Sequence, residues 1–133
     1  MTRQVVCDAS VVVALLLDAG PDGAWATSAL ADASLAAPNL VMFEASNVIR
    51  RHELAGLVSA DLAAQAHADL LDLPIEFWPF ELLAARVWQL RANLSSYDAS
   101  YVALAELIEA SLVTLDSRIS RAPGLKCEVR TPH

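Results

Sequence analysis

Lysine, glycine and cysteine are scarce in this sequence of 133 residues. One lysine and eight arginines stand against sixteen acidic residues, which gives a formal net charge of −7. The chain as a whole lacks the basic surface of a protein that binds nucleic acid regardless of sequence, so any such contact must be local. The four glycines form no Gly-x-Gly-x-x-Gly or Gly-Lys-Ser/Thr motif, so nothing predicts a loop for a dinucleotide or a nucleoside triphosphate.

The cysteines and the short apolar runs indicate in which cellular compartment the protein is located. Cys7 and Cys127 lie near opposite ends of the chain in expected strands, and we interpret both as buried free thiols. The longest apolar run, residues 9–17 broken only by Ser10, is about half the length of a transmembrane helix. Asp8 stands where a signal peptide would carry basic residues. We therefore expect a cytoplasmic protein that does not enter a membrane.

Hydrophobic patterning predicts a single domain over residues 1–133, since the length suits one core and no linker or internal repeat is present. Short β-branched and apolar segments predict strands at 3–7, 34–38, 75–78, 111–115 and 127–129. Helical patterns cover 21–33, 39–55, 59–73, 80–94, 98–110, the run 9–17 and a short segment after residue 116. Strands that alternate with helices predict a three-layer α/β/α domain with a mostly parallel central sheet.

The triplet Asp-Ala-Ser occurs twice, at 8–10 and at 98–100, each time at the start of an apolar helical segment. Asp8 ends the first expected strand and Asp116 ends the strand 111–115, so both belong at the carboxyl edge of a parallel sheet. Asp98 falls on the apolar stripe of its helix and should face inward. Glu44 lies with Asn47 on a polar stripe beside the apolar face of its helix, where it can lean over the same edge.

Taken singly, each of these acidic residues is adequately explained as a helix cap, a turn residue or an exposed helix residue. Together they indicate a functional cluster, because carboxylates gathered in one place need something to offset their repulsion. Two like charges about 4 Å apart repel by roughly 4 kcal/mol at an effective dielectric near 20. Converging carboxylates either take up protons or hold a cation. A cluster of oxygen ligands without cysteine or histidine favours a hard ion, Mg²⁺ or Mn²⁺, which keeps waters that a substrate phosphate can displace.

Four stretches of the chain resemble the PIN-domain ribonucleases, in particular the VapC-type toxins of toxin–antitoxin pairs. They are "VVCDASVVVALL", "APNLVMFEASNVIRR", "YDASYVALAE" and "LVTLDSRI", in the order of the family and spread from residue 4 to about residue 130. The resemblance implies that the catalytic and metal-binding acidic residues are Asp8, Glu44, Asp98 and Asp116. It also implies supporting roles for Ser10, Asn47 and Thr114.

The same resemblance implies an activity and partners. One or two Mg²⁺ or Mn²⁺ ions would activate a water that hydrolyses an RNA phosphodiester bond. Candidate contacts to the RNA backbone are Arg50, Arg51, Arg91, Arg118 and Arg121. Members of this family are neutralised by a VapB-type antitoxin and commonly pair as homodimers. Apolar surface for such contacts could come from Trp25, Phe77, Trp78, Phe80 and Trp88.

Two other interpretations of the acidic residues stay open. A receiver-type signalling module would also cluster carboxylates around Mg²⁺, but it needs a lysine after a late strand, and Lys126 precedes the last expected strand. An inactive interaction domain would keep the fold without the chemistry, although retention of four acidic positions argues against it. A dehalogenase-like phosphatase is excluded because it needs a second aspartate at the position of Ser10. His52, His67 and His133 show no zinc-ligand spacing.

Overall fold

A computed structural model describes residues 3–132 of the chain. Within that range five strands form one sheet in the order β3-β2-β1-β4-β5, and every neighbouring pair is parallel. The strands are β1 (Arg3–Cys7), β2 (Ala33–Pro38), β3 (Ile75–Trp78), β4 (Ser111–Val113) and β5 (Val129–Arg130). The predicted α/β class with a mostly parallel sheet is therefore confirmed.

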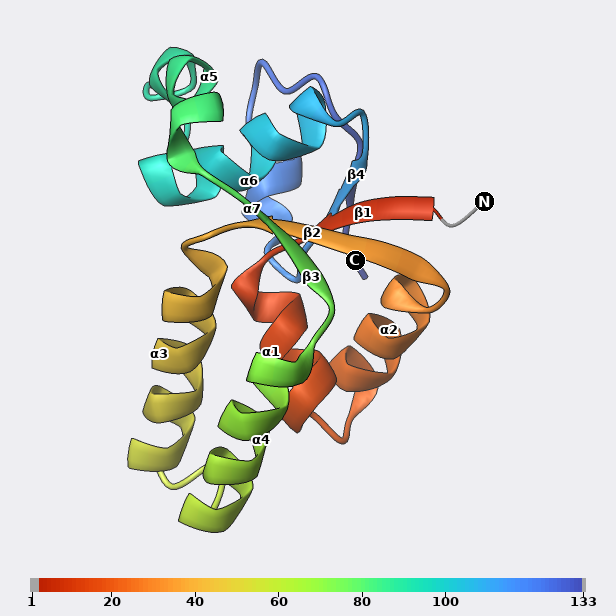
Figure 1. Ribbon diagram of the computed structural model, residues 1–133, viewed down its shortest axis with the longest axis vertical. Coiled ribbons are helices and arrows are strands. Elements are labelled where there is room, and N and C mark those ends of the chain that lie inside the picture. The colour runs from red at the N-terminus through yellow and green to blue at the C-terminus, as the bar shows by residue number, and fades with distance from the viewer. Residues whose placement is uncertain (1–2, 133) are drawn as a thin grey trace.

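Helices cover both faces of the sheet and complete the three layers (Figure 1). One layer holds α1 (Ala9–Leu17), α2 (Pro21–Leu30), α3 (Val41–Leu54) and α4 (Ala60–Asp72). The opposite layer holds α5 (Ala84–Gln89), α6 (Ser96–Leu107) and α7 (Ser117–Ser120), while the 3₁₀ turn η1 (Phe80–Leu82) follows β3. This division follows from the strand order, because right-handed crossovers toward β3 and toward β5 place their helices on opposite faces.

The centre of the sheet is built from segments that are apolar on all sides. Val5, Val6 and Cys7 in β1 are fully buried, and so are Ala36 in β2 and Val113 in β4. Helix α6 lies against this centre, and its residues 99–105 are all buried. Such continuous burial is typical of parallel sheets covered on both faces. It also fixes the start of α6 close to the carboxyl ends of β1 and β4.

Several predicted boundaries are wrong. The helix expected at 21–33 ends at Leu30, since Asp32 adopts a left-handed conformation with φ of 55° before β2 begins. The segment 80–94 splits into η1, α5 and turns, because the chain must leave helix before Ser95 can cap α6. Helix α6 begins at Ser96, two residues before Asp98, and it ends at Leu107. The strand expected at 127–129 begins only at Val129, so Cys127 precedes it and is half-buried.

The predictions of free cysteines and of no membrane-spanning segment can be compared with the structure of residues 3–132. Both cysteines are free, as predicted, and burial raises the pKa of the Cys7 thiol to about 12. Between residues 3 and 132 no single helix is both long and apolar enough to cross a membrane. Helices α1 and α2 reach the required length only in combination, with a bend of 112° between them.

Candidate functional site

The strand order places a topological switch point between β1 and β4. Connections from β1 run toward β2 and β3, whereas the chain returns from β3 across the sheet to β4 on the other side of β1. In open parallel sheets the crevice at such a point, outside the carboxyl ends of the strands, is where ligands bind. Asp8 follows β1 directly and Asp116 lies three residues after β4, so both occupy this crevice.

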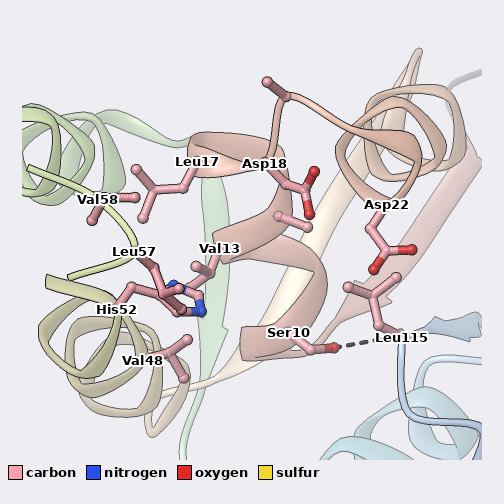
Figure 2. Close-up of a pocket in the computed structure, with 12 residues that line it drawn as sticks. Ser10, Val13, Leu17, Asp18, Asp22, Val48, His52, Leu57, Val58 and Leu115 are labelled. Atoms are coloured by element: carbon pink, nitrogen blue, oxygen red, sulfur yellow. Dashed lines mark hydrogen bonds between the residues drawn. The ribbon is translucent and has the colours of Figure 1, made fainter. Parts of the chain in front are cut away.

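The four predicted acidic residues line one cavity at this edge. Its volume is about 250 Å³, and its walls contain Asp8, Glu44, Asp98 and Asp116. They come from four different elements: the end of β1, helix α3, helix α6 and the segment after β4. The remaining walls are Ala9, Ser10, Asn47, Val48, Arg51 and Tyr101. A larger, mostly apolar cavity over α1 shares Ser10 and Val48 with it (Figure 2).

Asp8 is the most strongly fixed of the four carboxylates and is only 7% exposed. Its Oδ1 accepts a hydrogen bond from the Ser10 hydroxyl at 2.6 Å and one from the Val11 N–H at 3.2 Å, as the N-cap of α1. Its Oδ2 accepts a hydrogen bond from the fully buried Thr114 hydroxyl. Ser10 in turn accepts from the Leu115 N–H at 3.1 Å. The predicted supporting residues Ser10 and Thr114 therefore tie Asp8 to the end of β4.

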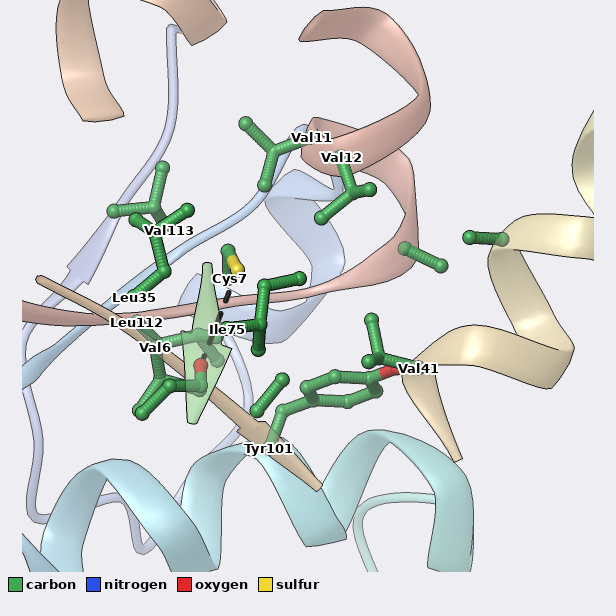
Figure 3. Close-up of a cluster of buried hydrophobic side chains, with 14 of the residues drawn as sticks. Val6, Cys7, Val11, Val12, Leu35, Val41, Ile75, Tyr101, Leu112 and Val113 are labelled. Atoms are coloured by element: carbon green, nitrogen blue, oxygen red, sulfur yellow. Dashed lines mark hydrogen bonds between the residues drawn. The ribbon is translucent and has the colours of Figure 1, made fainter. Parts of the chain in front are cut away.

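Glu44 is held by Tyr101, a residue that the sequence analysis did not select. The Tyr101 hydroxyl donates to Glu44 Oε1 at 2.5 Å, which links α6 to α3 across the edge of the sheet. Figure 3 shows the Tyr101 ring within the buried cluster, with its hydroxyl directed toward the start of α3. The spacing in the sequence places Tyr101 on the same helix face as Asp98, three residues further on, but it does not indicate the bond to Glu44.

Asp98 and Asp116 are positioned mainly by residues close to them in sequence. Asp98 lies in the first turn of α6, whose N-cap is Ser95, so Asp98 itself does not cap the helix. Asp116 caps α7 and forms a two-pronged ion pair with Arg118, with Nη2 to Oδ2 at 2.7 Å and Nε to Oδ1 at 3.0 Å. The Asp116 N–H donates to the Thr114 hydroxyl at 3.0 Å, so Thr114 contacts both Asp8 and Asp116.

Burial and the charges of neighbouring carboxylates both disfavour ionisation of three of these residues. Burial raises the pKa values of Asp8, Glu44 and Asp98 above their ordinary range, and the charge of Asp98 adds to the increase at both Asp8 and Glu44. The pKa of Asp116 is lowered instead, mainly by its hydrogen bonds with Arg118. Three carboxyl groups thus favour either a proton or a cation, and their oxygen atoms are the ligands that Mg²⁺ and Mn²⁺ prefer.

The side chains as they stand do not form a complete metal site. Among residues 3–132, no group of three acidic, histidine or cysteine side chains is arranged closely enough to hold an ion. The contacts above explain this spacing, because Tyr101 holds Glu44 toward α6 while Arg118 engages both oxygens of Asp116. A cation would supply the attraction that the like charges lack. The donor set therefore fits a hard divalent ion that several waters help to coordinate.

The other candidate residues are distributed unevenly around this cavity. Asn47 and Arg51 line it, and the charge of Arg121 helps to lower the pKa of Asp116. Arg50 lines a separate hollow between α3 and α4. Arg91 lies over the ring of Trp88, with its guanidinium carbon 4.5 Å from the ring centroid, and lines neither of these hollows. Arg118 joins Asp98 in a further polar hollow beside α6.

Known proteins resemble this chain in sequence and in structure. The family model described as "PIN domain" matches residues 5–125. Ribonuclease VapC9 of Mycobacterium tuberculosis is 37% identical over 125 residues, which cover 94% of this chain and 95% of that protein. The solved structure of PAE2754 from Pyrobaculum aerophilum superposes with a TM-score of 0.67 at 21% identity, covering 96% of this chain and 83% of that one. The structure of VapBC2 from Rickettsia felis bound to a DNA fragment from their promoter gives 0.67 at 16% identity, covering 96% and 98%.

Proposed function

The chain belongs to the PIN domain family, and from that premise we propose that it is an endoribonuclease that acts as the toxin of a toxin–antitoxin pair. The observation that carries the proposal is the shared cavity of Asp8, Glu44, Asp98 and Asp116 at the switch point of the sheet. Relatives that match over nearly their whole length are named ribonucleases. Hydrolysis of an RNA phosphodiester bond is the reaction that these groups suit best.

A divalent ion, Mg²⁺ or Mn²⁺, is the cofactor that we propose for this cavity. Asp8 and Asp98 would hold it directly, since both face the cavity and the pKa of Asp8 is raised by burial, with a further contribution from the charge of Asp98. Glu44 and Asp116 would complete the set, directly or through water. Bound there, the ion would lower the pKa of a water molecule and neutralise charge on the phosphate.

The side chains of the cavity prepare and orient the reacting groups. Ser10 and Thr114 each donate to one oxygen of Asp8, which leaves the remaining lone pairs of its carboxylate directed at the cavity. Tyr101 restricts Glu44 in the same way. The contact of Asp98 with Ser95 lies within its own helical turn, and the raised pKa of Asp98 suits a group that orients the attacking water and accepts its proton.

Arginines near the cavity provide the positive charge that an RNA backbone needs, although the chain is acidic as a whole. Arg51 lines the cavity, and Arg118 lies at its rim with 78% of its side chain exposed. If Asp116 served a bound cation instead of its ion pair, Arg118 would be available to contact an RNA phosphate. Arg121 is close enough to act on Asp116 and can serve the neighbouring phosphate. Arg50 and Arg91 are weaker candidates because neither lines the catalytic cavity.

The expected protein partners are a VapB-type antitoxin and a second copy of this chain. The structural neighbour VapBC2 supports an antitoxin partner. Of the aromatic residues proposed for such contacts, Trp88, Phe80 and Phe77 are exposed, whereas Trp25 and Trp78 pack partly against the core. Phe43 on α3, which the sequence analysis did not select, is 81% exposed. These apolar groups provide surface for both contacts.

A receiver-type role is less well supported. Its chemistry needs a lysine beside the clustered carboxylates, whereas Lys126 is exposed and lines a hollow near Glu106 and Cys127 on another part of the molecule. Labelling with acetyl phosphate would distinguish the two, because a receiver acquires a phosphoaspartate and a nuclease does not.

The test of the proposed function is cleavage of RNA by the purified protein. We expect cleavage with Mg²⁺ or Mn²⁺ and none with a chelator, and a loss of at least about a hundredfold in Asp98→Asn. Asp61→Asn is the matched control, since Asp61 also lies in the first turn of a helix but is exposed on α4. Equal cleavage by wild type and Asp98→Asn with Mg²⁺ would refute the proposal.

A further inference from the structure

The cavity over helix α1 is larger than the acidic one and has a different character. Its volume is about 440 Å³, within the range of about 300 to 1,000 Å³ that small-ligand pockets occupy. Its apolar walls are Val13, Ala14, Leu17, Ala19, Val48, Leu57, Val58 and Leu115. Four polar residues break this lining: Ser10 at the start of α1, His52 on the α3 side, and Asp18 and Asp22 on the α2 side (Figure 2).

The two cavities adjoin each other and share two lining residues. Ser10 and Val48 line both, and Ser10 is also the residue that holds Asp8. Arg51 lines the acidic cavity, and its neighbour in sequence, His52, lines the apolar one. A chain of nucleotides whose phosphate lies beside Asp8 therefore has space for an adjoining group over α1.

The charges of the cavity select which part of a nucleotide can enter it. Two carboxylates at the α2 side disfavour a phosphate, whereas apolar walls and the flat ring of His52 suit the faces of a nucleobase. Asp22 makes no hydrogen bond or ion pair with any of the residues 3–132 whose contacts are described. Asp18 uses Oδ1 to accept from the Gly20 N–H at 2.6 Å and keeps Oδ2 for another donor.

Carboxylates only accept hydrogen bonds, so they distinguish bases by their donors. Guanine presents two neighbouring donors, its ring N–H and its amino group, which match one carboxylate in a two-pronged arrangement. Uracil has a single donor between two carbonyl oxygens, which a carboxylate repels. We propose that the cavity over α1 binds a guanine next to the scissile phosphate, with Asp22 reading its donor edge and His52 against its face. This inference rests on the proposed ribonuclease activity.

The experiment compares cleavage of RNA oligonucleotides by wild type, Asp22→Asn, His52→Ala and Asp61→Asn. Sequencing of the products first locates the cut sites of the wild type, and the flanking guanine is then replaced by inosine, which lacks the amino group. We expect inosine to lower kcat/KM of the wild type about tenfold and to have little further effect in Asp22→Asn. His52→Ala should raise KM. Asp61→Asn, a first-turn aspartate on α4, should behave as wild type.

The outcomes separate the two proposals. No cleavage of any RNA with Mg²⁺ or Mn²⁺ would overturn the proposed function itself. Cleavage without a guanine at a fixed position beside the cut, or an inosine effect of equal size in wild type and Asp22→Asn, would overturn the guanine site alone. Thermal unfolding of each variant checks that it folds, and the inosine result in wild type holds whether or not Asp22→Asn is stable.

Discussion

The two Asp-Ala-Ser triplets show how the same three residues acquire different roles from their place in the fold. Asp8 stands between a strand and a helix, caps α1 and is almost completely buried. Asp98 stands inside the first turn of α6, where Ser95 is the cap, and is half-buried. Ser10 donates to Asp8 and reaches the segment after β4, whereas Ser100 donates back to the Tyr97 carbonyl at 2.6 Å within its own helix.

The two serines therefore differ in role: Ser10 positions a residue of the cavity, whereas Ser100 bonds only within its own helix. The first serine acts between elements, because it joins the ends of β1 and β4 beneath the cavity. The second serine satisfies its hydroxyl locally, as serines inside helices commonly do. Both aspartates line the cavity, but only Asp8 is anchored on both carboxylate oxygens. The account therefore predicts that equivalent changes in the two triplets have unequal effects.

The largest contrast is expected between Ser10→Ala and Ser100→Ala. Loss of the Ser10 hydroxyl removes one of the three hydrogen bonds that hold Asp8, and loss of such a partner to a metal-binding group typically costs about ten- to a hundredfold in activity. Ser100→Ala should leave kcat within about twofold and lower the free energy of unfolding by about 1 kcal/mol. RNA cleavage and denaturant unfolding measure the two effects. Equal loss of activity in Ser10→Ala and Ser100→Ala would contradict the different roles assigned to the two serines.

A smaller effect is expected at Tyr101, which follows the second triplet. Tyr101→Phe removes the donor that holds Glu44, so the Glu44 carboxylate should move more freely and its pKa should rise further. We expect affinity for Mn²⁺, measured by calorimetry, to fall about tenfold. Tyr97→Phe is the control, since Tyr97 lies on the same helix and is 64% exposed. An affinity unchanged in Tyr101→Phe would show that Glu44 needs no such support.

The smallest effect concerns stability against pH without metal. Because the pKa values of Asp8, Glu44 and Asp98 are raised in the folded protein, the folded state binds more protons than the unfolded state above the ordinary carboxyl pKa. The free energy of unfolding should therefore fall as pH rises through that window, chiefly because of the deeply buried Asp8. Denaturant titrations at pH 5 and pH 8 measure the difference.

Added Mg²⁺ should reverse this loss at pH 8, because it binds the ionised carboxylates of the folded state only. An ion at a hundred times its Kd contributes about 2.7 kcal/mol. Asp8→Asn should flatten the pH dependence more than Asp98→Asn does, since Asp8 is the more deeply buried. Stability that rises from pH 5 to pH 8 in the absence of metal would contradict the assigned repulsion.

Much of the fold follows from local patterns in the sequence. The apolar segments of β1 and β2 and the long helical run of α3 have strong signals, and their predicted positions are close to those observed. Boundaries that depend on tertiary contacts were less predictable. The end of α2 depends on a left-handed aspartate, Asp32, and β5 pairs with β4 over only two positions. Neither feature has a distinctive sequence signal.

The site was predictable where residues adjoin strand ends and less so where contacts cross layers. Asp8 and Asp116 could be placed at one edge from the parallel sheet alone. The bond from Tyr101 to Glu44 could not, since it depends on how α6 and α3 approach each other from opposite faces. Asp116 and Arg118 are close in sequence, but only the structure shows that the guanidinium of Arg118 donates to both carboxylate oxygens of Asp116.

The most direct measurement of the central claim is a crystal structure of this protein soaked with Mn²⁺, with the ion located by its anomalous scattering. The account predicts one peak within the cavity, about 2.1 Å from carboxylate oxygens of Asp8 and Asp98, with Glu44 and Asp116 completing its coordination directly or through water. A protein that cleaves RNA with Mn²⁺ but binds the ion away from these carboxylates would contradict it.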